Sequence, residues 1–172
     1  GALGQYERAM QDFDEAIRLD PRYAFACYGR GLAFHHLGQY ERAIQNFGEA
    51  IRLDPQYAVA YVARGLAYDN LGQYERVIED FDEAIRLDPQ YAIAYYSRGR
   101  AYDNLGQYER AIQEYDEAIR LDPQYAFAYF NRGGTYGTLG QYERAIQDFD
   151  EAIRLDPKYA WAYNNRGLAC QA

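Results

Sequence analysis

The chain has 172 residues and a formal net charge of −8 at pH 7. This acidity opposes binding to nucleic acid, whose phosphates need cationic partners, and it also opposes docking on an anionic membrane. Because no apolar run approaches the length of a membrane span and no signal-peptide pattern is present, we expect a cytoplasmic protein without nucleic-acid or membrane partners.

A 34-residue unit repeats along the sequence, and two dipeptides keep this step. Leu-Gly pairs begin at Leu3, Leu37, Leu71, Leu105 and Leu139, and Asp-Pro pairs begin at Asp20, Asp54, Asp88, Asp122 and Asp156. We expect a single array over residues 1–172, with a half-repeat (1–23), four full repeats (24–57, 58–91, 92–125 and 126–159) and a closing half-repeat (160–172). Cys27 and Cys170 are then too far apart for a disulfide, so we expect free thiols.

Each full repeat predicts two helices. Asp54 is a candidate N-cap for a first helix over Pro55–Gly72, and Gly72 is suited to close that helix in the left-handed conformation. A second helix is expected over about Tyr74–Leu87, where apolar residues recur at i, i+3, i+4 and i+7. The following Asp88-Pro89 pair ends it, because proline disfavours helical geometry in the residue before it.

The two half-repeats contribute one helix each, near Gln5–Leu19 and Ala160–Ala172, so ten helices are expected. One helix pair is too small to bury its apolar stripe alone, and short connections place successive helices antiparallel. The sequence therefore predicts an all-α solenoid of antiparallel helix pairs, in which neighbouring pairs stabilise one another.

The repeat resembles the tetratricopeptide repeat, whose pattern is W-x2-L-G-x2-Y, then A-x3-F, then P. The unit at 58–91 meets this pattern with Tyr61, Gly65, Tyr68, Val77, Phe81 and Pro89, and the unit at 92–125 meets it with Tyr95, Gly99, Tyr102, Ala111, Tyr115 and Pro123. The resemblance implies a right-handed superhelix whose first helices line a concave groove for an extended peptide or a partner's helix. The lysine-containing carboxylate clamp of some relatives is absent, because the only lysine, Lys158, lies in a turn.

One departure places arginine where the family pattern has leucine, at Arg30, Arg64, Arg98, Arg132 and Arg166. A buried arginine without a partner is costly, so one interpretation pairs each arginine with a carboxylate on an adjacent second helix, such as Asp80 or Asp82. The other interpretation is a row of arginines that binds phosphate groups, which the net negative charge disfavours.

The first helices differ between repeats, and their variable positions share one helical face. The resemblance assigns this face to the groove, where it would contact a protein or peptide partner. Asn131 and Asn165 also match two rungs of an asparagine ladder that some relatives present to a peptide backbone. The candidate groove residues are Phe25, Tyr28, Leu32, His35, Val62, Leu66, Asp69, Asn70, Tyr96, Arg100, Asp103, Asn104, Phe127, Phe130, Asn131, Trp161, Asn164 and Asn165.

Three of these aromatic residues, Phe25, Phe127 and Trp161, have a second interpretation, in which they fill gaps between adjacent first helices. The preferred partner contacts are therefore Tyr28, Tyr96 and Phe130.

The ends of the chain suggest a self-association surface. The opening helix carries Tyr6, Met10 and Phe13 without a first helix of its own, and the closing helix carries Tyr163, Gly167 and Cys170 without a second helix. One molecule's closing helix would complete a repeat with another molecule's opening helix, which gives a head-to-tail contact that need not close. The alternative is a chain cut from a longer array, whose ends associate only in crystals.

No residue pattern predicts catalysis, a cofactor or a metal site. His35 and His36 are adjacent in a helix and point about 100° apart, so they cannot ligate one metal ion together. There is neither a glycine-rich phosphate loop nor a recognisable nucleophile–base pair. We expect a protein-binding module that is not an enzyme, and the alternative function is a structural repeat that self-assembles head to tail.

Overall fold

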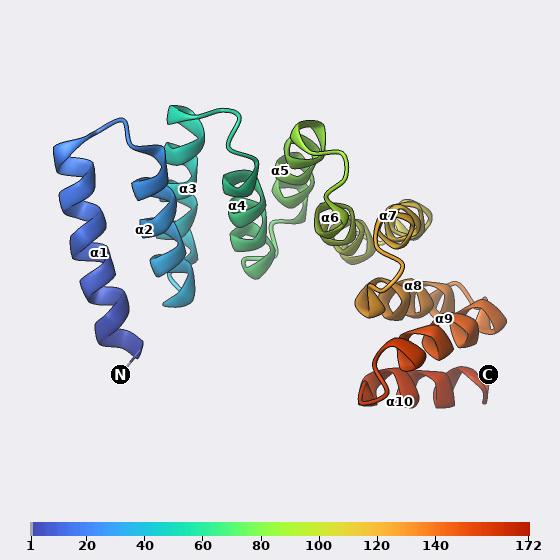
Figure 1. Cartoon of the computed structure of the whole chain (residues 1–172). Helices are drawn as coiled ribbons and strands as arrows, with labels where there is room; N and C mark the ends of the chain where they lie inside the picture. The colour runs from blue at the N-terminus through green and yellow to red at the C-terminus, as the bar shows by residue number, and fades with distance from the viewer. Residues whose placement is uncertain (1) are drawn as a thin grey trace. The chain divides into compact units, whose positions relative to one another are not determined.

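The computed structural model describes residues 2–172, with side chains from Gly4 onward. Over this range the chain forms ten α-helices and no strand (Figure 1), which confirms the all-α prediction. The first helices of the repeats are α2 (Ala24–His36), α4 (Ala58–Asn70), α6 (Ala92–Asn104), α8 (Ala126–Thr138) and α10 (Ala160–Ala169). The second helices are α1 (Ala2–Leu19), α3 (Tyr40–Leu53), α5 (Tyr74–Leu87), α7 (Tyr108–Leu121) and α9 (Tyr142–Leu155).

A glycine with positive φ follows the C-terminus of each of the first helices α2, α4, α6 and α8. Gly72 has a φ of +68°, and its N–H donates to the carbonyl of Asp69, while the N–H of Gln73 donates to the carbonyl of Tyr68. This is the Schellman pattern, which satisfies carbonyls that the helix leaves open. The predicted left-handed closure is confirmed at Gly72, and Gly38, Gly106 and Gly140 repeat it with φ values of 70°, 72° and 71°.

The start of the first helices differs from the prediction. Helix α4 begins at Ala58 rather than at Pro55, and Asp54 is not its N-cap. Instead, the Asp54 carboxylate accepts a hydrogen bond from the Gln56 N–H at 3.0 Å, and its carbonyl accepts one from the Tyr57 N–H at 3.1 Å. These bonds form a turn, and the ψ of 75° at Tyr57 lies outside the helical range, so the helix cannot extend back to the proline.

In each full repeat, a ring from the second helix packs on a glycine of the first helix. A Cβ added to Gly133 would lie 3.0 Å from a ring carbon of Phe149, which is itself buried. Gly65 is equally close to Phe81, and Gly31 and Gly99 lie closer still to the rings of Phe47 and Tyr115. Buried alanines fill the space around these rings, so each pair has a close-packed core.

The helices form two compact units, which are described separately below. Unit 1 covers residues up to Pro89 and contains α1 to α5, and unit 2 begins at Gln90 and contains α6 to α10. In unit 1, α2 packs against both α1 and α3, and in unit 2, α8 packs against both α7 and α9.

The arginine column is paired with acidic or amide side chains within the protein. The Arg64 guanidinium donates to both carboxylate oxygens of Asp80, at 2.6 to 3.2 Å. In unit 2, Arg132 donates to Asp148 at 2.7 and 2.8 Å and also to Asp116. The other pairs are Arg30 with Asn46 and Asp14, Arg98 with Glu114, and Arg166 with Asp150. The structure thus supports the structural interpretation of this column, including the expected partner Asp80.

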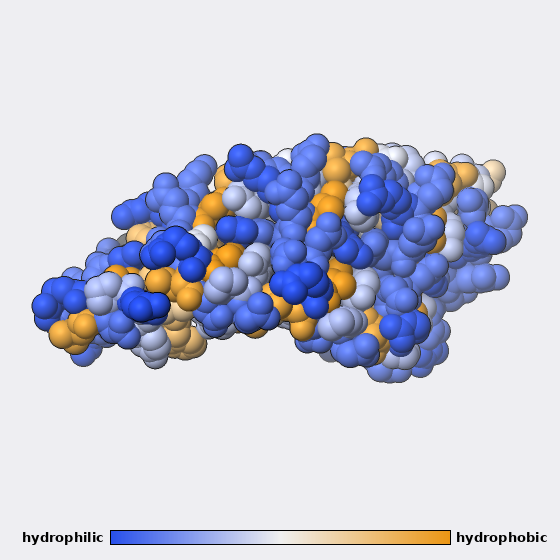
Figure 2. Space-filling view, turned by 90° about the horizontal axis from the view of Figure 1, so that it is seen from above, coloured by the Kyte–Doolittle hydropathy of each residue, from blue (hydrophilic) through white to orange (hydrophobic). Residues whose placement is uncertain are grey.

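Charged and polar residues dominate the outside. In the view of Figure 2, hydrophilic residues cover most of the surface, and apolar residues form separate patches between them. Cys27 is buried and Cys170 is exposed, and both are free thiols, as predicted. None of the helices in residues 2–172 is both long enough and apolar enough to cross a bilayer.

Candidate functional site

One column of large apolar side chains on the first helices is exposed in every repeat. It consists of Phe25 and Val59 in unit 1 and of Ile93, Phe127 and Trp161 in unit 2, each at the second residue of its helix, and we call it the exposed column. Its exposed fractions run from 40% at Val59 to 70% at Trp161. Within each unit, exposed apolar groups of this size are typical of binding surfaces when they recur on one face.

The next column along the same helices is half-buried, because a tyrosine of the following repeat stacks on it. The Tyr28 ring lies 5.2 Å from the Tyr57 ring, and the Phe130 ring lies 4.7 Å from the Tyr159 ring. Tyr96 has the same relation to Tyr125, at 4.8 Å. Phe25, Phe127 and Trp161 are thus more exposed than Tyr28, Tyr96 and Phe130, the residues that the sequence favours as partner contacts.

Val62 belongs to the same half-buried column and departs furthest from the prediction. Its side chain is only 6% exposed, so it packs in the core of unit 1 and offers no surface to a partner. The small neighbour Ala63 is also buried, which leaves Leu66 as the partly exposed apolar side chain farther along α4.

Several polar candidates are already engaged within the protein. The Asn131 amide donates to the Tyr96 hydroxyl and to the Phe127 carbonyl, each at 2.9 Å. Asp103 accepts a hydrogen bond from Thr135 at 3.0 Å, and burial raises the pKa of that carboxyl. The amides of Asn70 and Asn104 donate to carbonyls one turn earlier in their own helices, while Leu32, Asp69 and Arg100 are half-buried.

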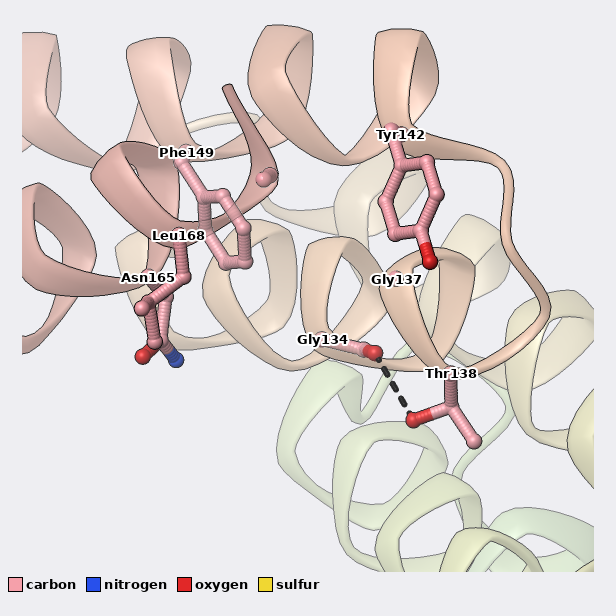
Figure 3. A pocket seen from close by; sticks show the side chains of 8 residues that line it. Gly134, Gly137, Thr138, Tyr142, Phe149, Asn165 and Leu168 are labelled. Carbon is pink, nitrogen blue, oxygen red and sulfur yellow. Dashed lines mark hydrogen bonds between the residues drawn. The ribbon is translucent and has the colours of Figure 1, made fainter. Parts of the chain in front are cut away.

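Unit 2 contains a pocket that is lined by residues of α8, α9 and α10 (Figure 3). Its volume is about 330 Å³, which lies within the range of small ligand pockets in proteins. We call it the glycine pocket. Its lining residues are Gly134, Gly137, Thr138, Tyr142, Phe149, Asn165, Leu168 and Ala169. Phe149 and Leu168 contribute apolar side chains to this lining, and Thr138, Tyr142 and Asn165 contribute polar groups.

The pocket exists because two variable positions of α8 are glycine. In unit 1 the matched positions are Leu32 and His35; Leu32 packs against the cluster around Phe47, and the His35 ring lies 5.3 Å from the Tyr40 ring. In unit 2, Gly134 and Gly137 leave these volumes empty, and a Cβ added to either would meet no atom within 4 Å. Neither glycine is required by crowding or by a positive φ.

The glycine pocket was not predicted from the sequence. Gly134 and Gly137 lie at variable positions of the first-helix face, but only side chains that could contact a partner were predicted as groove residues. A second signal was available, since a glycine inside a helix costs about 1 kcal/mol relative to alanine and therefore invites an explanation. Of the predicted groove residues, Asn165 lines the pocket, and Phe127 and Trp161 belong to the exposed column of the two helices, α8 and α10, that form its walls.

The tyrosines that stack on Tyr96 and Phe130 are neutral hydrogen-bonding groups at physiological pH. Burial raises the pKa of Tyr159 to about 12, and it also raises the pKa of Tyr125. Within residues 2–172 no three His, Cys, Asp or Glu side chains converge on a possible metal position. The His35 and His36 rings meet edge to face instead of pointing at a common centre.

The six residues predicted for self-association fall into three groups. Tyr163, Gly167 and Cys170 are exposed on α10. Phe13 and Tyr6 are half-buried and line a second pocket between α1 and α2. Met10 differs from the prediction, because it packs against the cluster around Phe34 on the other side of α1.

Comparison with known proteins gives repeat-family matches over residues 2–172. A family model described as "TPR repeat" matches residues 2–38, 31–72, 99–140 and 136–172, and models described as "Tetratricopeptide repeat" match residues 58–91 and 81–113. No functionally curated relative matches the chain.

Several solved structures are similar to this chain over most of its length. A crystal structure of MamA is 27% identical, covers 91% of this chain and 92% of its own, and has a TM-score of 0.85. MamA of Desulfovibrio magneticus RS-1 is 25% identical, with coverage of 91% and 89% and a TM-score of 0.85. YrrB, described as a TPR protein with an unusual peptide-binding site, is 25% identical, with coverage of 96% and 86% and a TM-score of 0.83.

Proposed function

Because the chain belongs to the tetratricopeptide repeat family, we propose that it is a non-catalytic module that binds a peptide segment of a partner protein on its first-helix face. The observation that carries this proposal is the glycine pocket of unit 2. Gly134 lies inside α8, where glycine reduces helix stability, and Gly137 lies in its last turn; together they leave a cavity that is partly lined by apolar side chains, on helices that also carry exposed aromatic residues. A surface that gives up stability to keep a cavity open is typical of a binding site.

The pocket accepts one apolar side chain, such as leucine or phenylalanine, as the anchor of the bound segment. Phe149 and Leu168 contribute apolar surface for such a side chain, while Thr138 and Asn165 offer hydrogen bonds to the peptide backbone beside it. Phe127 and Trp161 then cover neighbouring residues of the segment, because they are the exposed aromatic residues of the two wall helices. The formal charge of −8 disfavours strongly acidic segments.

Similarity to YrrB supports this proposal by analogy, since that protein shares the fold over most of both chains and is described as having a peptide-binding site. The non-catalytic part of the proposal rests on the sequence, in which the carboxylates repeat with the helix surface and no nucleophile has a base at a recognisable spacing.

The test is selection from a random peptide library displayed on phage, with the wild-type chain as bait and the Gly134→Leu variant as the counter-selection. Leucine is the residue at the matched position 32, so the substitution fills the pocket with a side chain that the repeat tolerates. The proposal predicts peptides that share an apolar anchor and bind only the wild type. Peptides that bind both proteins equally would contradict it.

The matched control is Gly134→Ala, which adds one methyl group to the same helix. It stabilises α8 by up to about 1 kcal/mol and leaves most of the pocket volume open. Selected peptides are expected to bind this variant, although less tightly than the wild type. Loss of binding in Gly134→Leu together with higher thermal stability separates a blocked site from a misfolded one.

A further inference from the structure

The glycine pocket of unit 2 is elongated along α9. Two of its lining residues, Tyr142 and Phe149, lie on α9, two helical turns apart on the same face. This spacing separates them by about 10 Å along the helix axis. Because α8 runs antiparallel to α9 and Gly133 lies against the Phe149 ring, Gly137 lies toward Tyr142. The pocket therefore has a Phe149 end and a Tyr142 end.

The Tyr142 end carries a hydroxyl that is available to a ligand. Figure 3 shows the Tyr142 side chain pointing from α9 toward α8 near Gly137. Its hydroxyl forms no hydrogen bond with the residues that the structure describes, and Tyr142 is 37% exposed. The matched tyrosine of unit 1, Tyr40, is instead covered by the His35 ring, whose centre lies 5.3 Å from its own. Glycine at position 137 thus leaves the Tyr142 hydroxyl open.

The Phe149 end is apolar, and the lining as a whole is uncharged. Phe149 and Leu168 contribute apolar side chains, and none of the lining residues is acidic or basic. A charged group placed in this pocket would lose hydration without gaining an ion pair, which is costly. The pocket is therefore suited to a side chain that has an apolar body and a neutral polar tip.

The α8 wall favours an aromatic ring over a branched aliphatic side chain. Gly134 and Gly137 lie about one helical turn apart, so this side of α8 presents a strip of backbone without side chains, and a Cβ added to either would meet no atom within 4 Å. A flat ring can lie along this strip and pack against Phe149 at the same time. Leucine would fill the Phe149 end only and would leave the Tyr142 hydroxyl without a hydrogen bond to the ligand.

We propose that the anchor of the bound segment is a tyrosine. Its ring lies between Phe149 and the strip of Gly134 and Gly137, and its hydroxyl forms a hydrogen bond with the Tyr142 hydroxyl. The tyrosine anchor rests on the proposed function, because it requires a segment seated in the glycine pocket, and it narrows the anchor from any apolar side chain to an aromatic one with a polar tip. A phenylalanine anchor fits the same space without this bond and binds about 2- to 10-fold more weakly.

A displayed peptide library tests the proposal, with one central position limited to Tyr, Phe and Leu and random residues on both sides. Selection on the wild type, with Gly134→Leu as the counter-selection, is expected to enrich tyrosine over phenylalanine and leucine at that position. Selection on Tyr142→Phe is expected to lose the preference for tyrosine over phenylalanine. Tyr40→Phe is the matched control, since it removes the same hydroxyl outside the pocket, and it should select like the wild type.

Titration calorimetry then compares the best tyrosine peptide with copies that carry phenylalanine or phosphotyrosine at the anchor. On the wild type, the phenylalanine copy should bind about 2- to 10-fold more weakly. The phosphotyrosine copy should lose at least about 10-fold, because the lining holds no cation for the phosphate. On Tyr142→Phe, the tyrosine and phenylalanine peptides should bind nearly equally.

Peptides that bind the wild type but not Gly134→Leu, and that show no preference for tyrosine, would overturn the tyrosine anchor and leave the proposed function standing. A tyrosine preference that Tyr142→Phe retains would also overturn it, as would a phosphotyrosine copy that binds as tightly as the tyrosine peptide. A library from which no peptide binds the wild type would overturn both proposals.

Discussion

Replacing Arg132 by leucine, the residue of the family pattern, tests whether the arginine column is structural. The Arg132 side chain is 17% exposed and its partner Asp148 is 9% exposed, so the substitution leaves a buried carboxylate without its cation. Burial raises the pKa of Asp148 even with Arg132 in place, which shows the direction of the desolvation penalty. Removing one partner of a buried pair costs about 3–5 kcal/mol.

For a chain of this size, that loss corresponds to a fall in the melting temperature of about 6–20 °C. Calorimetry measures it directly, and the first transition is expected to involve unit 2, because repeat arrays unfold in parts. Arg166→Leu is the matched control, since Arg166 is more exposed and its ion-pair partner among the described residues is the exposed Asp150. The melting temperature of this variant is expected to differ little from that of the wild type.

A double variant, Arg132→Leu with Asp148→Leu, is expected to recover most of the stability, because no buried charge is left unpaired. A melting temperature of Arg132→Leu equal to that of the wild type would contradict a structural role of this arginine. A structural role would also be contradicted if inorganic phosphate raised the melting temperature of the wild type but not of Arg132→Leu, since that result would favour the phosphate-binding interpretation.

Two smaller predictions concern single groups. The Tyr115 hydroxyl is buried with no hydrogen-bond partner among residues 2–172, so Tyr115→Phe should stabilise unit 2 by about 1 kcal/mol in denaturant titrations, and a destabilised variant would show a partner after all. Burial lowers the pKa of His35, so the unfolded chain binds a proton that the folded chain excludes, and stability falls as the pH drops below about 6.5. His35→Gln should reduce this loss in melting curves from pH 7 to 5, and a pH dependence that the substitution leaves unchanged would refute the assignment.

Much of the fold could be predicted from the sequence because the same helix and turn signals recur in each repeat. The 34-residue step, the closing glycines and the apolar stripe give the helices, and Gly72 behaves as its position indicates. The start of each first helix could not be predicted in the same way. Asp54 and Pro55 fit a helix start locally, but the Asp54 carboxylate and carbonyl hold the backbone in a turn that ends only at Tyr57.

The candidate site was harder to predict because it depends on contacts between repeats. Tyr28 is withdrawn from the solvent by Tyr57, which lies outside the first helix that carries it, and no periodicity within one repeat shows this contact. The glycine pocket is defined by missing side chains at Gly134 and Gly137. Glycine offers no side chain to a partner, so its place in the sequence does not indicate a cavity.

The central claim is that the glycine pocket binds the apolar anchor of a peptide, and the fluorescence of Trp161 tests it most directly. Trp161 is the only tryptophan, is 70% exposed and lies on a wall helix of the pocket. Titration with a selected peptide should shift its emission to shorter wavelength in the wild type and leave Gly134→Leu unchanged. An equal shift in both proteins, at the same peptide concentration, would contradict the account.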